Sequence, residues 1–267
     1  MSGDMMFQDE IREVVRRAYR GIPSGAGRAM AGRFYSDEEL SRVPERAIGW
    51  ARGVGNPVRH AGLSSGDAVL DIGCGGGIDT ILAAHRVGPT GRVVGLDMLP
   101  EMCDRARAAA AAAGTQPWCE FRHGLMEDIP LPDASIDVVI SNGVINLSPR
   151  KARALAEITR VLKPGGRFCV ADLTVDDDLP NEVLTSEAAW AGCISGALSE
   201  RVFTNKLDNA GLAEVHMSHR ARFGIDDVAL YPLFTAEVLD LMRRLIPRDR
   251  HDRVAVGLIV RAVKPHA

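Results

Sequence analysis

The sequence has no long apolar run and no excess of positive charge. No stretch of its 267 residues approaches the ~20 apolar residues that span a bilayer, so we expect no membrane segment. The formal net charge of −3 gives no basic balance that would favour nucleic acid or an anionic membrane as a partner. The first residues carry acids and lack a hydrophobic signal core, so we expect a cytoplasmic protein.

Cysteines are few and are not spaced as a metal site or redox motif. The chain has five, an odd number, and no two have C-x-x-C spacing. We therefore expect reduced thiols and no metal site. The length, with 46% hydrophobic and 25% charged residues, fits one α/β domain with additions.

The most informative motif lies between residues 68 and 97. An apolar run ends in Asp71 and opens into the glycines Gly73, Gly75 and Gly77; a helical pattern follows, and a second apolar run ends at Asp97. This order predicts strand, tight turn, helix and strand, the first half of a doubly wound α/β domain. The glycines would let the backbone approach a ligand, the helix N-terminus would face an anion, and Asp97 suits the hydroxyls of a ribose.

The glycine spacing distinguishes between cofactors. A dinucleotide fingerprint, G-x-G-x-x-G, would place its third glycine at residue 78, which is Ile78. A nicotinamide oxidoreductase is therefore disfavoured. The form present, D-x-G-x-G-x-G, resembles the first motif of class I S-adenosylmethionine-dependent methyltransferases.

The remaining chain predicts a single α/β domain with helical additions. Residues 1–65 predict helices that form a lid, with a connector at 21–32 and a helix N-cap at Ser36 or Asp37. Residues 66–267 carry the sheet, with cap insertions at about 176–210 and 219–250. The expected strands cover residues 68–70, 93–96, 118–122, 138–141, 167–173, 214–218 and 254–262. Two helices are expected at about 180–198 and 199–210.

Several further segments resemble the bacterial arsenite methyltransferase group of class I methyltransferases, over most of the chain to about residue 218. They are YSDEELSRVPE (35–45), GVGNP (53–57), VLDIGCGGGID (69–79), VGLDMLPEM (94–102), SNGVINLSP (141–149), RVLKPGGR (160–167) and AGCISGAL (191–198). The glycine motif and the KPGG turn occur in many methyltransferases. The GNP segment and the SN-x-VINLS segment are more particular to this group.

The resemblance implies a seven-stranded, mostly parallel sheet whose last strand is antiparallel, with a helical cap. It also implies an S-adenosylmethionine site, with S-adenosylhomocysteine as product. Asp71, Gly73, Gly75 and Gly77 would line the methionine and ribose region, and Asp97 would hold the ribose hydroxyls. The resemblance further implies that Met98 packs on the adenine, that Met126 and Glu127 take the adenine edge, and that Asn142 sits beside the methionine end.

Two positions depart from the family in a way that concerns the substrate. The family holds trivalent arsenic with cysteine thiolates, since soft ligands suit a thiophilic centre. Two of these cysteines are replaced here by Val54 and Gly143, whereas Cys193 keeps its thiol. One thiolate cannot chelate arsenic as two or three do, so we infer another acceptor.

Catalytic and substrate residues are less clearly marked, because methyl transfer needs alignment more than acid–base chemistry. Tyr19 and Tyr35 precede the sheet where lid helices close in this family, and a tyrosine near the sulfonium is plausible. His219, expected just past the sixth strand, is a candidate general base. The substrate-binding candidates are Gly143, Cys193 and Tyr231.

The sequence therefore predicts an S-adenosylmethionine-dependent methyltransferase acting on a small organic metabolite, as a monomer or homodimer. One alternative is arsenite methylation with Cys193 and a thiol cosubstrate such as glutathione. Another is a protein that binds S-adenosylmethionine without catalysis.

Overall fold

The computed structural model describes residues 2–21, 27–175, 196–231 and 234–266. The segment before the sheet, residues 1–65, is called the lead-in. Its described part holds five α-helices: α1 (Ser2–Arg20), α2 (Gly27–Ala31), α3 (Asp37–Ser41), α4 (Glu45–Ile48) and α5 (Pro57–His60). The first half of the sheet region holds β1 (Ala68–Ile72), α6 (Ile78–Val87), β2 (Arg92–Asp97), α7 (Pro100–Ala112), β3 (Cys119–His123) and β4 (Ile136–Asn142). The second half holds α8 (Lys151–Val161), β5 (Leu162–Thr174), α11 (Glu200–Asn209), β6 (Ala213–Phe223), α12 (Ile225–Val228), α13 (Ala236–Leu245) and β7 (Ala255–Val263).

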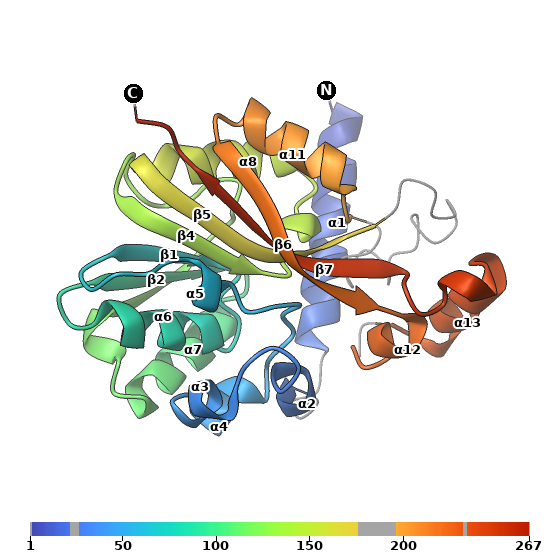
Figure 1. Cartoon of the computed structure of the whole chain (residues 1–267), viewed down its shortest axis with the longest axis horizontal. Coiled ribbons are helices and arrows are strands. Elements are labelled where there is room, and N and C mark those ends of the chain that lie inside the picture. The colour runs from blue at the N-terminus through green and yellow to red at the C-terminus, as the bar shows by residue number, and fades with distance from the viewer. Residues whose placement is uncertain (1, 22–26, 176–195, 232–233, 267) are drawn as a thin grey trace.

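The strands form one seven-stranded sheet in the order β3-β2-β1-β4-β5-β7-β6 (Figure 1). Each pair from β3 to β5 is parallel, and β7 runs antiparallel to both β5 and β6. The prediction of a seven-stranded, mostly parallel sheet with an antiparallel last strand is therefore confirmed. The strand order reverses between β1 and β4, and ligands of open α/β sheets bind at such a switch point.

Helices cover both faces of the sheet, as a doubly wound fold requires. In β1, Val69 packs in the apolar cluster that includes α6 and α7. Leu70 and Ile72 pack in the other cluster, with α8 and α11. This alternation follows from the period of two of a strand, and Figure 1 shows α8 and α11 across the sheet from α6 and α7.

The lead-in is helical, as predicted, but the expected connector at 21–32 is partly wrong. Residues 27–31 form α2, whose Met30 and Ala31 are buried. A side chain at position 27 would collide with the carbonyl oxygen of Ile48. Gly27 therefore permits α2 to pack closely against α4. The expected cap is confirmed: Ser36 accepts a hydrogen bond from the Glu39 amide and precedes α3 in a capping box.

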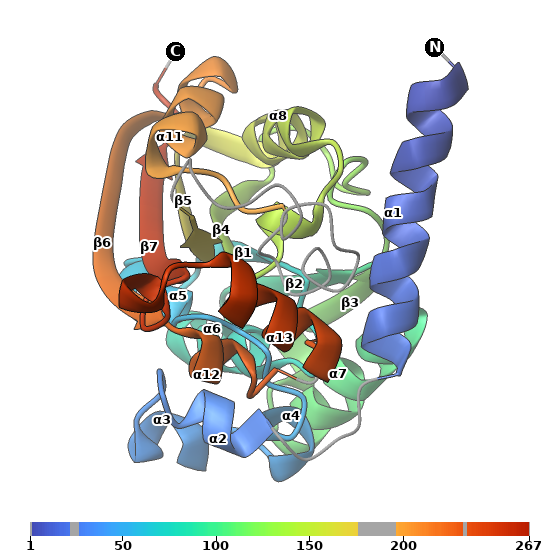
Figure 2. The ribbon, with the colours of Figure 1, turned by 90° about the vertical axis from the view of Figure 1, so that its right-hand side faces the viewer.

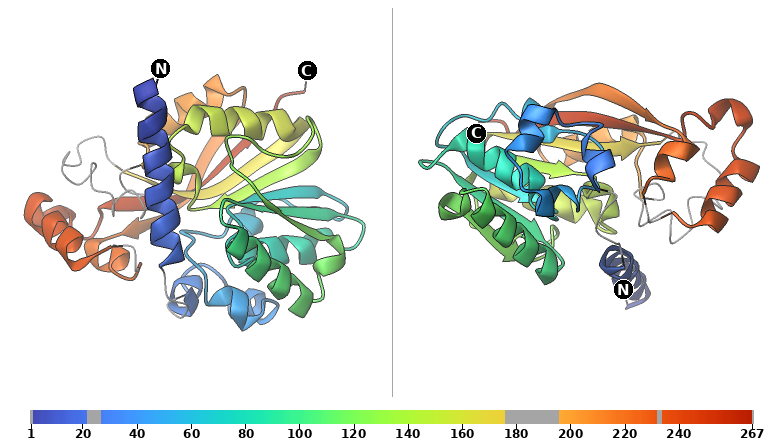
Figure 3. Two further views of the ribbon diagram at one scale, coloured as in Figure 1. Left: turned by 180° about the vertical axis from the view of Figure 1, so that it is seen from behind. Right: turned by 90° about the horizontal axis from the view of Figure 1, so that it is seen from below.

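Helix α1 runs along the outside of the fold, on the side away from β6 (Figure 2). Figure 3 likewise shows it beyond the other helices. Two ion pairs join it to the sheet region, Arg20 to Glu101 at 2.7 Å and Arg12 to Glu127 at 3.8 Å.

The second expected helix of the 176–210 insertion is confirmed by α11, whereas the first, at about 180–198, lies largely outside the described residues. Strand β6 extends to Phe223, beyond the expected end at 218, so the 219–250 insertion begins inside a strand. Helices α12 and α13 follow it. Among the described residues, no helix combines the length and apolarity needed to cross a bilayer.

Candidate functional site

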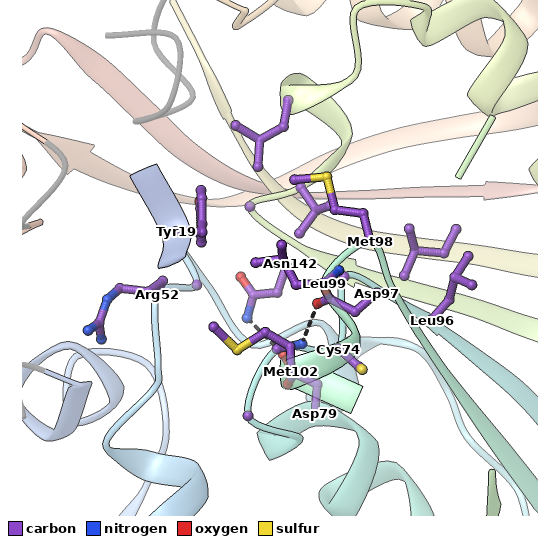
Figure 4. A pocket seen from close by; sticks show the side chains of 18 of the residues that line it. Tyr19, Arg52, Cys74, Asp79, Leu96, Asp97, Met98, Leu99, Met102 and Asn142 are labelled. Atoms are coloured by element: carbon purple, nitrogen blue, oxygen red, sulfur yellow. Dashed lines mark hydrogen bonds between the residues drawn. The ribbon is translucent and has the colours of Figure 1, made fainter. Parts of the chain in front are cut away.

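A large cavity opens at the carboxyl ends of β1 to β4, roofed by the lead-in helices. It holds about 1320 Å³ of empty space, part of it open to solvent. Its lining is drawn both from the strand ends and from residues 12–53, so a ligand bound here would touch the sheet and the N-terminal helices together. Ten of its lining residues are labelled in Figure 4.

The glycine loop forms the floor of the cavity. Gly73 and Gly75 line it with φ angles of +73° and +50°, which L side chains rarely adopt. A side chain at Gly73 would also strike Val144, with its Cβ 2.7 Å from Cγ1. Gly77 was expected to line the ligand, but it lies behind the loop, capping α6 at φ +93° and packing against Ala106 of α7.

Asp97 faces the cavity from the end of β2, as predicted. Its Oδ2 accepts a hydrogen bond from the Gly75 amide at 3.0 Å, and its Oδ1 accepts one from the Leu99 amide at 2.9 Å. Burial raises the pKa of Asp97, while these two amide donors act in the opposite direction. The carboxylate is thereby fixed in orientation beside the glycine loop.

Asp71 was expected in the methionine and ribose region, and the structure places it elsewhere. Its side chain is 2% exposed and is not among the residues that line the cavity. Its Oδ2 accepts a 2.5 Å hydrogen bond from Thr80 Oγ1, inside α6. Burial, with the nearby Asp79, raises the pKa of Asp71 to about 8. Asp71 thus joins β1 to α6 beneath the site.

Asn142 links the lead-in to the sheet. Its Oδ1 accepts a hydrogen bond from the Val54 amide at 2.8 Å, and its Nδ2 donates to the Gly55 carbonyl at 2.9 Å. Nδ2 also lies 3.0 Å from Asp79 Oδ2 (Figure 4). It lies 3.0 Å from Tyr35 Oη as well. Asn142 therefore holds the Gly-Asn-Pro segment against the end of β4.

Asp79 is the acid that sequence reasoning missed. It lines the cavity and accepts a 2.8 Å hydrogen bond from the Tyr35 hydroxyl. Burial raises the pKa of Asp79 to about 6, although the bonds from Asn142 and Tyr35 lower it. In sequence it is an ordinary acid in the first turn of a helix, a pattern common enough to carry no functional signal.

Tyr35 and Tyr19 both line the cavity, as expected. Tyr35 is buried and donates its hydroxyl proton to Asp79; burial raises its pKa well above the usual value. It therefore suits a positioning role and does not suit a base. Tyr19 projects from α1 over the cavity (Figure 4).

The residues expected at the adenine end also line the cavity. They are Met98, Met126 and Glu127. Glu127 is buried, with Oε1 accepting a 2.5 Å hydrogen bond from Ser148 Oγ. Arg12 of α1 lies 3.8 Å from the same oxygen, which places an ion pair across the mouth of the site.

The three substrate-binding candidates, Gly143, Tyr231 and Cys193, differ in their position relative to the cavity. Gly143 lines the cavity at φ +72°. Tyr231 donates its hydroxyl proton to the Gly53 carbonyl at 3.1 Å and is not a lining residue, so it supports the segment beside the site. Cys193 lies outside the described residues.

His219 is not brought to the cavity. It lies within β6, is exposed, and has φ +52°; its ring stacks on His60 with centroids 3.9 Å apart. The prediction that it follows the strand and reaches a cap pocket is wrong, because β6 continues four residues past it.

The donor set fits S-adenosylmethionine. The cavity offers a loop of backbone amides before α6, a fixed carboxylate at the end of β2, and apolar surface from Leu96, Met98 and Met102. Amides at a helix N-terminus bind a carboxylate, and Asp97 suits vicinal hydroxyls. The apolar side chains suit a purine ring.

Comparison with known proteins agrees with this geometry. The family model described as "Methyltransferase domain" matches residues 63–211. An arsenite methyltransferase of Halobacterium salinarum is 36% identical over 233 residues, which is 79% of this chain and 59% of that protein. A demethylmenaquinone methyltransferase of Symbiobacterium thermophilum is 39% identical over 103 residues, 39% of this chain and 41% of that protein.

A solved structure extends the likeness to three dimensions. The arsenic(III) S-adenosylmethionine methyltransferase of Chlamydomonas reinhardtii matches with a TM-score of 0.68 and 31% identity, covering 92% of this chain and 75% of that one. The chain spans 59% and 50% of the length of two arsenite methyltransferases that it matches, those of Halobacterium salinarum and Aquipseudomonas alcaligenes.

Proposed function

The chain belongs to the methyltransferase-domain family, with the fold of class I S-adenosylmethionine-dependent methyltransferases, and on this premise we propose that it methylates a small organic metabolite. The observation that carries the choice of acceptor is the pair Val54 and Gly143. The resemblance puts arsenic-binding cysteines at these two positions, and here neither carries a thiol. Among the described lining residues the only thiol is Cys74, in the glycine loop.

The lining of the cavity suits an organic acceptor. Tyr19, Phe34 and Trp50 add aromatic surface to the cavity. Apolar pockets with a few placed polar groups are typical of small-molecule sites. Gly143 adds no side-chain volume, so more room is left for a bulky acceptor than a cysteine would leave.

The bound cofactor supplies an electrophilic methyl group on a sulfonium, and the chain's residues provide alignment. Asp97 and the glycine-loop amides fix one partner. Asn142 holds the Gly-Asn-Pro segment, and Tyr35 and Asp79 hold Asn142 in turn, which positions the neighbouring Gly53 in the cavity wall. The lead-in helices line one side of the cavity and reduce its exposure to water, which favours transfer to the acceptor over side reactions.

The test uses the purified protein, methyl-labelled S-adenosylmethionine and a metabolite extract, with mass spectrometry of the products. We expect a labelled organic product that the Asp97→Ala variant does not form. If the wild type binds the cofactor but labels nothing in the extract or on arsenite, the activity proposal is refuted and a non-catalytic binding protein is favoured.

Arsenite methylation is the second candidate, favoured by the 36% identity to the Halobacterium enzyme. A parallel reaction with arsenite and glutathione tests it. Labelled methylarsenic that disappears in Cys193→Ser would support this candidate and refute the organic acceptor. No methylarsenic from a protein that binds the cofactor would refute it.

A further inference from the structure

Arg105, on α7, contacts two residues that line the cofactor cavity, although it does not line the cavity itself. Its guanidinium carbon lies over the Trp50 ring, 3.9 Å from the ring centroid. Its Nη1 also donates to the Met102 sulfur at 3.6 Å. Trp50 and Met102 are both lining residues. One side chain outside the lining therefore joins a lining residue of the lead-in to a lining residue of α7.

Trp50 and Met102 belong to the part of the cavity that is formed by the glycine loop and the end of β2. A Cβ built on Gly76 would lie 2.8 Å from the Trp50 Cβ, so the glycine permits Trp50 to pack directly on the loop. Met102 is in the first turn of α7, which begins three residues after Asp97. The contact of Arg105 is therefore at the end of the cavity where we place the cofactor.

The contact with Trp50 is a cation–π interaction. A cation within about 6 Å of the centroid is attracted by the negative face of the ring, and the indole ring attracts it best. Arg105 is half-buried, so water screens this attraction less than it would at a fully exposed site. The planar guanidinium of arginine can also stack on the ring, which the ammonium of lysine cannot do. The contact therefore restricts the orientation of the Trp50 ring.

The neighbouring charges on α7 have different roles. Glu101, one turn before Arg105, pairs with Arg20 of α1 at 2.7 Å, and both side chains are largely exposed. Arg107 pairs with Asp104 of the same helix, with its side chain 49% exposed. Exposed ion pairs contribute little to stability. Neither pair includes a residue that lines the cavity, whereas both printed contacts of Arg105 do.

We propose that Arg105 is a positioning residue for cofactor binding, which acts by holding Trp50 and Met102 in place beside the glycine loop. Without this contact the Trp50 ring gains freedom in the empty protein, and ligand binding must order it again. That ordering costs affinity, whereas a side chain that is already fixed costs none. The inference rests on the S-adenosylmethionine site and is independent of the organic acceptor in the proposed function.

The first experiment measures the affinity of the full chain for S-adenosylhomocysteine by isothermal titration calorimetry. Arg105→Leu, which removes the cation and keeps apolar bulk, should bind about fivefold more weakly than wild type. Arg105→Lys should bind about threefold more weakly, because the charge remains and the stacking is lost. Arg107→Leu, on the same helix, is the matched control and should bind as wild type.

The second experiment is a double-mutant cycle that asks whether Arg105 acts through Trp50. In a Trp50→Leu background, Arg105→Leu should weaken S-adenosylhomocysteine binding by less than a further twofold. A general loss of structure in α7 would instead add its full effect. Trp118→Phe with Trp190→Phe leaves Trp50 as the only indole of the three in the chain. In that background, Arg105→Leu should shift the emission of the ligand-free protein to longer wavelength, because water reaches the ring.

The proposal is overturned if Arg105→Leu binds S-adenosylhomocysteine with wild-type affinity, or if the losses of Arg105→Leu and Trp50→Leu add in full. If Arg105→Leu does not fold, Arg105→Lys decides: a threefold loss supports the proposal and wild-type affinity refutes it. These measurements use no acceptor. A protein that labels no metabolite would therefore leave this proposal standing, and unchanged affinity in Arg105→Leu would leave the organic acceptor standing.

Discussion

A Cβ built on Gly143 would lie 3.7 Å from Cγ1 of Val54, although the two residues are far apart in sequence. Asn142, which directly precedes Gly143, explains this proximity. Its side-chain oxygen accepts a hydrogen bond from the Val54 amide. The two positions at which the resemblance to arsenite methyltransferases implies cysteines therefore face each other in this fold. Their replacement affects one shared place beside the cavity.

We expect Gly143→Ala to separate cofactor binding from acceptor turnover. The new methyl group would meet Val54 and the Arg52 carbonyl at ordinary contact distance, so it fits, at a strain cost of about 1 kcal/mol for φ +72°. Cofactor affinity should change less than twofold, while kcat/KM for the acceptor should fall about tenfold. Calorimetry and steady-state kinetics measure the two effects, and a parallel loss of both would contradict this assignment.

Asp97→Asn should weaken S-adenosylhomocysteine binding by about 10- to 100-fold, because a charged acceptor is lost and an amide NH₂ is placed near the Gly75 or Leu99 amide. Isothermal titration calorimetry measures the affinity of each variant for S-adenosylhomocysteine. The control is Asp104→Asn, an exposed acid on α7 paired with Arg107, which should bind as wild type. Equal affinities for Asp97→Asn and wild type would remove Asp97 from the cofactor site.

Asn142→Ala should lower the free energy of unfolding by about 2–4 kcal/mol, because the buried Val54 amide and the Oδ2 atom of Asp79 both lose their hydrogen bond to Asn142. Thermal unfolding followed by circular dichroism measures the loss. Asn209→Ala, at the exposed end of α11, is the control and should change little. A Tm within a degree of wild type would show that Asn142 does not hold the lead-in.

Gly73→Ala should be more destabilising than Gly62→Ala, although both residues have positive φ. A Cβ at Gly62 meets nothing within 4 Å, whereas one at Gly73 would strike Val144. Gly62→Ala should therefore cost only the backbone strain of about 1–2 kcal/mol, and Gly73→Ala that strain plus the collision. Chemical denaturation compares them, and equal losses would argue against a steric role for the glycine loop.

Asp71 should make stability depend on pH. Its folded-state pKa of about 8 lies above the unfolded value of 3.8, so its contribution is fully present below about pH 4 and is lost as pH rises through 8. Asp71→Asn keeps an acceptor for Thr80 without the charge. Its Tm relative to wild type should therefore increase between pH 5 and pH 9.

The matched control for the pH series is Asp208→Asn on the exposed side of α11. Its Tm difference from wild type should stay flat across the same range. A domain of this size shifts by roughly 2–4 °C per kcal/mol, which calorimetry resolves. A flat difference for Asp71→Asn as well would mean that its carboxyl titrates as in the unfolded chain.

The sequence by itself determined the class of fold and one half of the site. Apolar runs separated by glycine turns predict strands locally, and the acid that ends β2 follows the glycine loop at a fixed spacing. Both signals are local in the chain, which is why Asp97, Gly73 and Gly75 lie where they were expected.

Only the tertiary structure decided which of the two acids Asp71 and Asp79 lines the cavity. Asp71 turns to Thr80 beneath the site, while Asp79 meets Tyr35 and Asn142, which are 44 and 63 residues away. The position of His219 inside β6 is likewise set by packing between distant segments. Spacing along one segment fixes what that segment forms, but side-chain partners from other segments depend on how the layers pack.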